Sequence, residues 1–287
     1  MNNTQNQSVN SLLFRRNLAR FCITAFCALV AFLAFYPFFV MVISSTHNST
    51  NIVSKINILP GTNLAANYER LTRNMDIVNG IKNSIFLAVS VTIIEAYFAV
   101  MTTYAFAKFN FKGKNFLFAI ILVFMMLPGQ LGIIGFFKEV QAMKLINSYV
   151  PLIVPSIANC FAVFFYKQYM DTSLPTELIE AAIMDGCKEL QIFHSLVIPL
   201  VKPAMITQGV LTFIGTWNSY LNPLILLNDK SKFTLTLLIA TVRDATHADY
   251  GAQYLGMVIS VIPTIIIYCF GSKTIMEKIT VGAAVKG

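Results

Sequence analysis

Charged residues are scarce in this chain: Asp, Glu, Lys and Arg together make up 12% of its 287 residues. A typical soluble domain is about a quarter charged and somewhat under half apolar. Here 56% of the residues are hydrophobic, which excludes a disordered chain and disfavours a soluble enzyme. A bilayer core of about 30 Å takes roughly 20 helical residues per span, so the length suits about six membrane spans.

Cysteine and histidine are too few and too scattered for a metal site or a disulfide framework. The five cysteines form no C-x-x-C pair, and four of them lie in apolar runs, where a thiol behaves as a small hydrophobic side chain. The three histidines, His47, His194 and His247, share no ligand spacing. We therefore expect no metal, no cofactor and no catalytic residue in this chain.

The net charge of +8 does not indicate nucleic-acid binding, because the basic residues lie between long apolar runs, as they do in membrane proteins. Six runs are long enough and apolar enough to cross a bilayer: residues 21–43, 84–107, 116–137, 149–166, 204–227 and 252–271. The first run is too long for the apolar region of a signal peptide, so we interpret it as a retained span. The expected fold is an all-α integral membrane protein with six transmembrane helices.

Basic residues near the span ends predict the orientation. Arg15, Arg16 and Arg20 precede the first span, and the connection Lys108–Lys114 is short and basic. By the positive-inside rule both segments are cytoplasmic, which places the N-terminus and the C-terminus inside the cell. The expected organisation is a cytoplasmic N-terminal segment (1–20), a transmembrane domain (21–274) and a cytoplasmic C-terminal tail (275–287).

The connection between the fourth and fifth predicted spans is long and has helical features. Pro175 and Glu177 suit a first helical turn, because proline lacks an N–H that would be unpaired there and an acid complements the helix dipole. Gly186 suits the end of this helix, in a left-handed conformation. One helical face collects Leu178, Ala181, Ala182 and Asp185. A second short helix is predicted over about 188–197, ending at Pro199, which makes 175–199 a helix–turn–helix.

This segment resembles the EAA loop of ABC importer permeases. The matching motif is Glu180-Ala181-Ala182-x-x-Asp185-Gly186, followed after nine residues by Leu196-x-Ile198-Pro199, where the family prefers Ile and Leu at the positions of Leu196 and Ile198. The resemblance extends over almost the whole chain and is closest to the second, smaller permease of carbohydrate importers, as in the maltose system. Other matching stretches are Asn67-Tyr68, Asn83-Ser84, Tyr104-Ala105-Phe106-Ala107, Met126-Leu127-Pro128-Gly129-Gln130, Asn147-Ser148-Tyr149, Trp217-Asn218, Pro223-Leu224 and the tail Gly282–Gly287.

The resemblance implies a type I ABC importer permease that imports a sugar, expected to be an oligosaccharide, across a bacterial cell membrane. The implied partners are a homologous second permease, a dimer of separate ATPase subunits that bind ATP and Mg, and an extracellular or periplasmic sugar-binding protein. The implied ATPase-coupling residues are Glu180, Ala181, Ala182, Asp185, Gly186, Phe193 and Pro199. The implied ATPase-contacting tail residues are Ala284, Val285, Lys286 and Gly287.

Two features suit a substrate pathway, and each has an alternative interpretation. Trp217, Asn218, Tyr220 and Asn222 combine aromatic rings and amides, which suit sugars but equally suit a membrane interface and helix packing. Glu95 is the one ionisable residue inside a predicted span. Placing an acid there costs roughly 2.5–3.5 kcal/mol, so it should face protein or a wet cavity. It would serve substrate or proton transfer, or make a polar contact with the second permease.

Two other function classes remain as alternatives to the permease. A stand-alone ion-coupled secondary carrier would use Glu95 and should contain an inverted repeat, which the sequence does not visibly contain. An intramembrane enzyme would need clustered acids, histidine or a nucleophile at membrane depth, where only Glu95 is available. The stretch Gly271-Ser272-Lys273-Thr274 lacks the earlier glycine of a phosphate-binding loop, so the energy source must be elsewhere. We therefore expect a transport subunit and not an enzyme.

Overall fold

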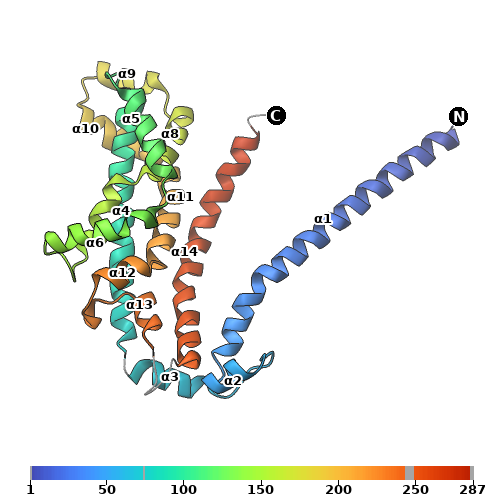
Figure 1. Ribbon diagram of the computed structural model, residues 1–287. Coiled ribbons are helices and arrows are strands. Elements are labelled where there is room, and N and C mark those ends of the chain that lie inside the picture. The colour runs from blue at the N-terminus through green and yellow to red at the C-terminus, as the bar shows by residue number, and fades with distance from the viewer. Residues whose placement is uncertain (1, 74, 243–248, 285–287) are drawn as a thin grey trace. The chain divides into compact units, whose positions relative to one another are not determined.

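The computed structural model describes residues 2–73, 75–242 and 249–284, and the side chains of residues 16–73, 75–242 and 249–271. The described backbone is helical and contains no strand, as the sequence predicts (Figure 1). The described residues form two compact units. The first lies within Met1–Arg73 and Val242–Val258, and the second lies within Asn74–Thr241 and Ile259–Gly287.

The first unit contains α1 (Asn2–Ser44), α2 (Ser49–Ser54), α3 (Leu64–Arg73) and the beginning of α14 (Tyr250–Ala284). From Arg16 to Ser44, α1 is apolar enough to span a membrane. Many of its large apolar side chains are exposed, including Phe21, Phe26 and Phe32. In water such a surface would be costly, whereas lipid or another apolar helix can cover it.

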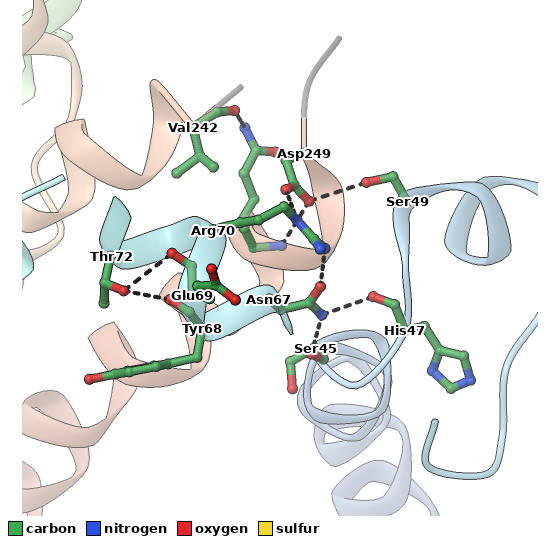
Figure 2. A network of polar contacts seen from close by, with 12 residues as sticks. Ser45, His47, Ser49, Asn67, Tyr68, Glu69, Arg70, Thr72, Val242 and Asp249 are labelled. Atoms are coloured by element: carbon green, nitrogen blue, oxygen red, sulfur yellow. Dashed lines mark hydrogen bonds and ion pairs between the residues drawn. The ribbon is translucent and has the colours of Figure 1, made fainter. Parts of the chain in front are cut away.

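A polar network holds the first unit together (Figure 2). Asn67 is fully buried, and its Nδ2 donates to the backbone oxygens of Ser45 at 2.7 Å and His47 at 2.9 Å. Arg70 donates to the side-chain oxygen of Asn67, and its Nε donates to the Asp249 carboxylate at 2.6 Å. The network therefore connects the end of α1, the helix α3 and the residue that precedes α14.

The second unit is built around α4 (Ile77–Lys108), which begins where the Asp76 side chain accepts a hydrogen bond from the backbone N–H of Asn79 at 2.9 Å. Helix α4 packs mainly against α8 (Cys160–Ser173) and α11 (Ile198–Trp217). Apolar residues on these three helices form a continuous core, in which Ala99, Ala162 and Val201 have no exposed surface. The small side chains of Ala99 and Ala162 let the backbones of α4 and α8 approach closely.

Short helices cover the two ends of α4 (Figure 1). At its C-terminal end lie α9 (Thr176–Met184) and α10 (Glu189–Ile192), and a π-helical turn, η3 (Phe193–Val197), joins α10 to α11. At its N-terminal end lie α12 (Leu221–Leu226), the 3₁₀ turn η4 (Lys230–Lys232) and α13 (Leu235–Ala240). The short helices at the C-terminal end of α4 belong to residues 175–199, the segment that resembles the EAA loop.

Five stretches of the described chain are long and apolar enough to cross a membrane: Arg16–Ser44, Ile77–Lys108, Val150–Ser173, Glu189–Trp217 and Tyr250–Gly271. The predicted span 116–137 is broken instead. Helix α5 (Lys114–Met126) is bent by 89° from the stretch formed by η1 (Gly129–Gly132) and α6 (Ile133–Ala142). Pro128 lies in this break. Proline has no N–H to donate within a helix and disfavours α-helical backbone in the residue before it, which accounts for the end of α5. Counting the bent pair gives six spans.

Other span boundaries also differ from the sequence prediction, and the predicted span 84–107 begins seven residues earlier, at Ile77. The predicted span 149–166 corresponds to Val150–Ser173. It starts with α7 (Val150–Ile153) and the 3₁₀ turn η2 (Val154–Ala158), and its helix α8 continues to Ser173. The predicted span 204–227 is displaced toward the N-terminus and occupies Glu189–Trp217. The predicted short helix over 188–197 is therefore the beginning of a span, and Pro199 does not end it. Pro199 lies in the first turn of α11, where its missing N–H is tolerated.

Candidate functional site

We define the coupling segment as residues 175–199. Its first helix, α9, follows Pro175 and has Glu177 in its first turn, as predicted. Gly186 has φ +81°, the left-handed conformation expected for a residue that ends a helix. The N–H of Gly186 donates to Ile183 O at 2.9 Å, and the next N–H, of Cys187, donates to Ala182 O at 3.0 Å. These bonds satisfy carbonyls at the end of α9 and turn the chain sharply.

Buried apolar residues attach the coupling segment to the rest of the second unit. Ile179 anchors α9, and Phe193, which is 2% exposed, belongs to the same core cluster. The Phe193 ring packs against the rings of Tyr97 and Tyr104 on α4, with centroids 5.7 and 5.8 Å away. Phe193, predicted as an ATPase-coupling residue, therefore supports the segment from behind and does not form part of its surface.

An ion pair also connects α10 to α4. Lys108, at the C-terminal end of α4, pairs with Glu189 in the first turn of α10. The hydroxyl of Tyr104 donates to the same carboxylate at 3.2 Å. Glu189 lies at the N-terminal end of α10, where the helix dipole favours a negative charge. Lys108 lies at the C-terminal end of α4, where the dipole favours a positive charge. The two residues are 81 positions apart along the chain, so no local sequence pattern predicts this pair.

The outward surface of the coupling segment mixes acidic and apolar side chains. Glu180, Ala181, Asp185, Gly186 and Pro199 are exposed, and Ala182 is half-buried. Exposed apolar residues accompany them: Leu178, Ile183, Leu190 and Met184, which is 87% exposed. The helical face predicted from Leu178, Ala181, Ala182 and Asp185 is therefore mainly an outward face. Exposed apolar residues rimmed by polar ones are typical of a protein–protein contact.

Glu95 lies near the middle of α4 and is 3% exposed. Its Oε2 accepts a hydrogen bond from Nδ2 of Asn159 at 2.7 Å. Its Oε1 accepts from Oγ1 of Thr212 at 2.5 Å and from Nε2 of Gln208 at 3.2 Å. The predicted polar contact of Glu95 is thus supplied by α11 and by the residue that precedes α8. No second chain is needed to satisfy this carboxylate.

An open groove lies beside Glu95, with a volume of about 370 Å³. Its polar lining residues are Glu95, Ser156, Asn159, Gln208, Thr212 and Thr216. Phe161 and Leu211 add apolar surface. We call this the Glu95 groove. The sequence did not lead us to predict the amide and hydroxyl partners of Glu95. Isolated polar residues inside an apolar run, such as Gln208 with Thr212 one helical turn later, indicate a polar face that could have identified them.

The aromatic and amide cluster predicted for a substrate pathway is divided in the structure. Trp217 is 1% exposed, stacks on Phe213 with centroids 6.0 Å apart, and donates from Nε1 to Ser260 O at 3.0 Å. Its indole is a core residue that a sugar cannot reach in this structure. Asn218, Tyr220 and Asn222 are exposed where the chain leaves α11 and enters α12. They are not among the residues that line the Glu95 groove.

The predicted ATPase-contacting tail is described only at its beginning. Ala284 is the last residue of α14. Val285, Lys286 and Gly287 lie outside the described residues. The tail therefore remains a prediction.

Comparison with known proteins identifies the family. The family model "Binding-protein-dependent transport system inner membrane component" matches residues 96–275. The arabinooligosaccharides transport system permease protein AraQ of Bacillus subtilis is 33% identical over 272 residues, which cover 93% of this chain and 96% of that protein. The lactose transport system permease protein LacG of Rhizobium radiobacter is 30% identical over 254 residues, covering 88% of this chain and 92% of that protein.

A solved structure shares the fold. It is the crystal structure of a bacterial ABC transporter involved in the import of the acidic polysaccharide alginate. One of its chains superposes with a TM-score of 0.77 at 23% identity, over 90% of this chain and 96% of that one. These similarities do not support the alternative of a stand-alone ion-coupled carrier. The chain belongs to the family of binding-protein-dependent transport system inner membrane components and is a membrane-spanning permease of the ABC importer type.

Proposed function

We propose that this permease imports a sugar, expected to be an oligosaccharide, as one half of a translocation pathway whose other half is a homologous second permease. The named relatives AraQ and LacG are permeases for arabinooligosaccharides and lactose, which supports a sugar substrate. A separate binding protein would deliver the sugar from outside the membrane. Both termini and the coupling segment would lie on the cytoplasmic side.

The coupling segment is proposed to bind a separate ATPase subunit, and one observation carries this proposal. Glu180 and Asp185 are exposed beside exposed apolar side chains, while Ile179 and Phe193 fix the same segment to the core. A surface that transmits force must contact a partner on its exposed side and be attached to the protein core on its buried side. The arrangement meets both requirements, and the tail residues Ala284, Val285, Lys286 and Gly287 are proposed to add a second contact.

The proposed mechanism uses energy from the partner. ATP and Mg would bind to the ATPase dimer, whose closure would move the coupling segments of both permeases and change the pathway from inward-facing to outward-facing. A ligand shifts a two-state equilibrium only by its difference in affinity for the two states. The ATPase dimer must therefore bind one orientation of the coupling segments more tightly than the other. This chain contributes no hydrolytic step of its own.

Affinity purification from the native locus tests the proposal. The chain is expressed from its native locus and purified in mild detergent, with Glu180→Lys as the test variant and Glu139→Lys as the control. Both acids are exposed, and Glu139, on α6, lies outside the coupling segment. We expect an ATPase and a second permease to co-purify with the wild type and the control, and the ATPase to be lost with Glu180→Lys. Purification of the chain alone would contradict the proposal.

The sugar assignment is tested separately, on the binding protein of the same system. The binding protein is isolated without added ligand, and the small molecule it releases on denaturation is identified by mass spectrometry. We expect an uncharged saccharide. Release of an amino acid or a metal ion would contradict the sugar assignment and leave the permease assignment intact.

A further inference from the structure

The Glu95 groove is not explained by attachment to an ATPase. It lies along α4, α8 and α11 within the membrane-spanning part of the second unit, away from the coupling segment. Its volume of about 370 Å³ is near the lower limit of small-molecule sites, which span roughly 300–1,000 Å³. The groove is therefore large enough for part of a saccharide and too small for a long one.

Hydrogen-bond acceptors are left over in this groove. A carboxylate offers about four lone-pair positions, and Glu95 uses three of them for Asn159, Gln208 and Thr212. Gln208 is 3% exposed and donates its amide hydrogens to Glu95 and Thr212. Its carbonyl oxygen is buried and has no hydrogen-bond partner among the described residues. A buried acceptor without a donor is costly, so a ligand hydroxyl that donates to it would be favoured.

The charge of the groove has one sign. Glu95 is the one acidic side chain among the described residues that line the groove. None of the described residues that line the groove is Lys, Arg or His. An anionic ligand would therefore meet a negative charge without a compensating cation, at a depth where water screens charges poorly.

An aromatic ring completes the lining. Phe161 is 47% exposed and lines the groove, two residues after Asn159 in the chain. Phe165 supports it from the next turn, with the two rings nearly parallel and their centroids 6.5 Å apart. An exposed ring face beside amide and hydroxyl groups matches the apolar faces and hydroxyl edges of a sugar ring. The combination that the sequence suggested around Trp217 is thus present at Glu95 instead.

We propose that the Glu95 groove is a substrate subsite of this permease, which binds the hydroxyl groups of an uncharged saccharide and disfavours anionic ligands. The inference rests on the proposed function, because it assigns the subsite to the sugar carried by the same importer. Glu95 and Gln208 accept hydrogen bonds from ligand hydroxyls, and Phe161 packs against the sugar ring.

Thiol reactivity in the groove tests the proposal without requiring the natural sugar. Ser156 lines the groove, and Ser156→Cys is introduced after the five native cysteines are replaced with alanine. Membranes from cells that express this chain at its native locus are treated with three methanethiosulfonates: the neutral methyl reagent, the anionic sulfonatoethyl reagent and a glucose-bearing reagent. Each modification rate is divided by the rate of the same reagent with free 2-mercaptoethanol.

Two fold-changes are expected. Adding Glu95→Gln should increase the normalised rate of the anionic reagent about tenfold, since a negative charge that lines the same poorly screened groove is removed. The glucose-bearing reagent should react about threefold faster than the methyl reagent, the effect of one neutral hydrogen bond, and Gln208→Met should abolish this advantage. Ser148→Cys is the control, because Ser148 does not line the groove and its reactivity should not respond to Glu95→Gln.

Three results would overturn the proposal. A cysteine at position 156 that reacts with no reagent would mean that lipid or the second permease fills the groove. An anionic rate that Glu95→Gln leaves unchanged would exclude the charge selection, and equal rates for the glucose-bearing and methyl reagents would exclude hydroxyl binding. Trp217 emission of each variant, measured on the purified chain in detergent micelles, confirms that the variant is folded. None of these readouts needs ATP or the ATPase, so failure here is distinguishable from failure of the co-purification.

Discussion

Replacement of Glu95 by leucine should destabilise the second unit by an amount that the structure defines. The change removes the acceptor of three hydrogen bonds, donated by Asn159, Gln208 and Thr212. Side-chain hydrogen bonds inside membrane proteins contribute about 0.6 kcal/mol each on average, so the loss should be about 2 kcal/mol. Glu95→Gln keeps one carbonyl oxygen as an acceptor, and its loss should be about 1 kcal/mol by the same reasoning.

The single tryptophan of the chain provides the assay. Trp217 is buried against Phe213 at the end of the helix that carries Gln208 and Thr212, so its emission reports unfolding of this region. The purified chain in detergent micelles is titrated with sodium dodecyl sulfate, and the free energy of unfolding is compared among wild type, both variants and the exposed control Glu180→Gln. A Glu95→Leu protein within about 0.5 kcal/mol of wild type would refute the argument that this network stabilises the unit.

Three further variants test other features. Gly186→Ala should destabilise the end of α9 by about 1–2 kcal/mol through its positive φ and accelerate proteolysis there, whereas Gly135→Ala, with open space around its Cβ, should not. Phe193→Ala should cost about 3–5 kcal/mol in thermal or detergent unfolding and weaken ATPase co-purification without altering the exposed surface. Hydrogen bonds from the backbone and side chain of Ser231 lower the pKa of Asp229, so its stabilisation of η4 should persist above about pH 4, the ordinary value, and be lost as the pH falls through the lower folded-state pKa. The protection factor of the Ser231 amide in hydrogen exchange measures this loss. Asp229→Asn should remove the pH dependence of this protection factor.

Much of the fold could be predicted because bilayer length and apolar composition are local properties. The apolar runs identified the helices, and the left-handed Gly186 followed from its position after a helical pattern. Helix boundaries were less accurate where the chain is apolar on both sides of a break. Composition alone could not show that the chain bends by 89° at the break that contains Pro128 but continues as one helical span through Pro199, because both prolines lie in apolar sequence.

The site was predicted in part, for a similar reason. The motif around Glu180 is contiguous, so its exposure on α9 follows from local structure. The partners of Glu95 come from positions 64 to 117 residues away, and no local pattern specifies such pairs. For Trp217 the residue type suited a sugar surface, a membrane interface and helix packing equally, and packing with Phe213 buries the ring. An aromatic side chain supplies a large apolar surface to a core as readily as to a ligand.

The unbroken helical course from α10 through η3 into α11 limits how this part of the molecule can move. Glu189 and Gln208 lie about 30 Å apart along it, at 1.5 Å per residue, and both are bonded to α4, through Lys108 and Glu95. Two points of attachment to one neighbour remove two degrees of freedom, sliding along the helix axis and rotation about it. The π turn η3 lies between the two points, and its Phe193 packs against Tyr97 and Tyr104 of α4, so a force on α10 is transmitted to α4 as well as to α11.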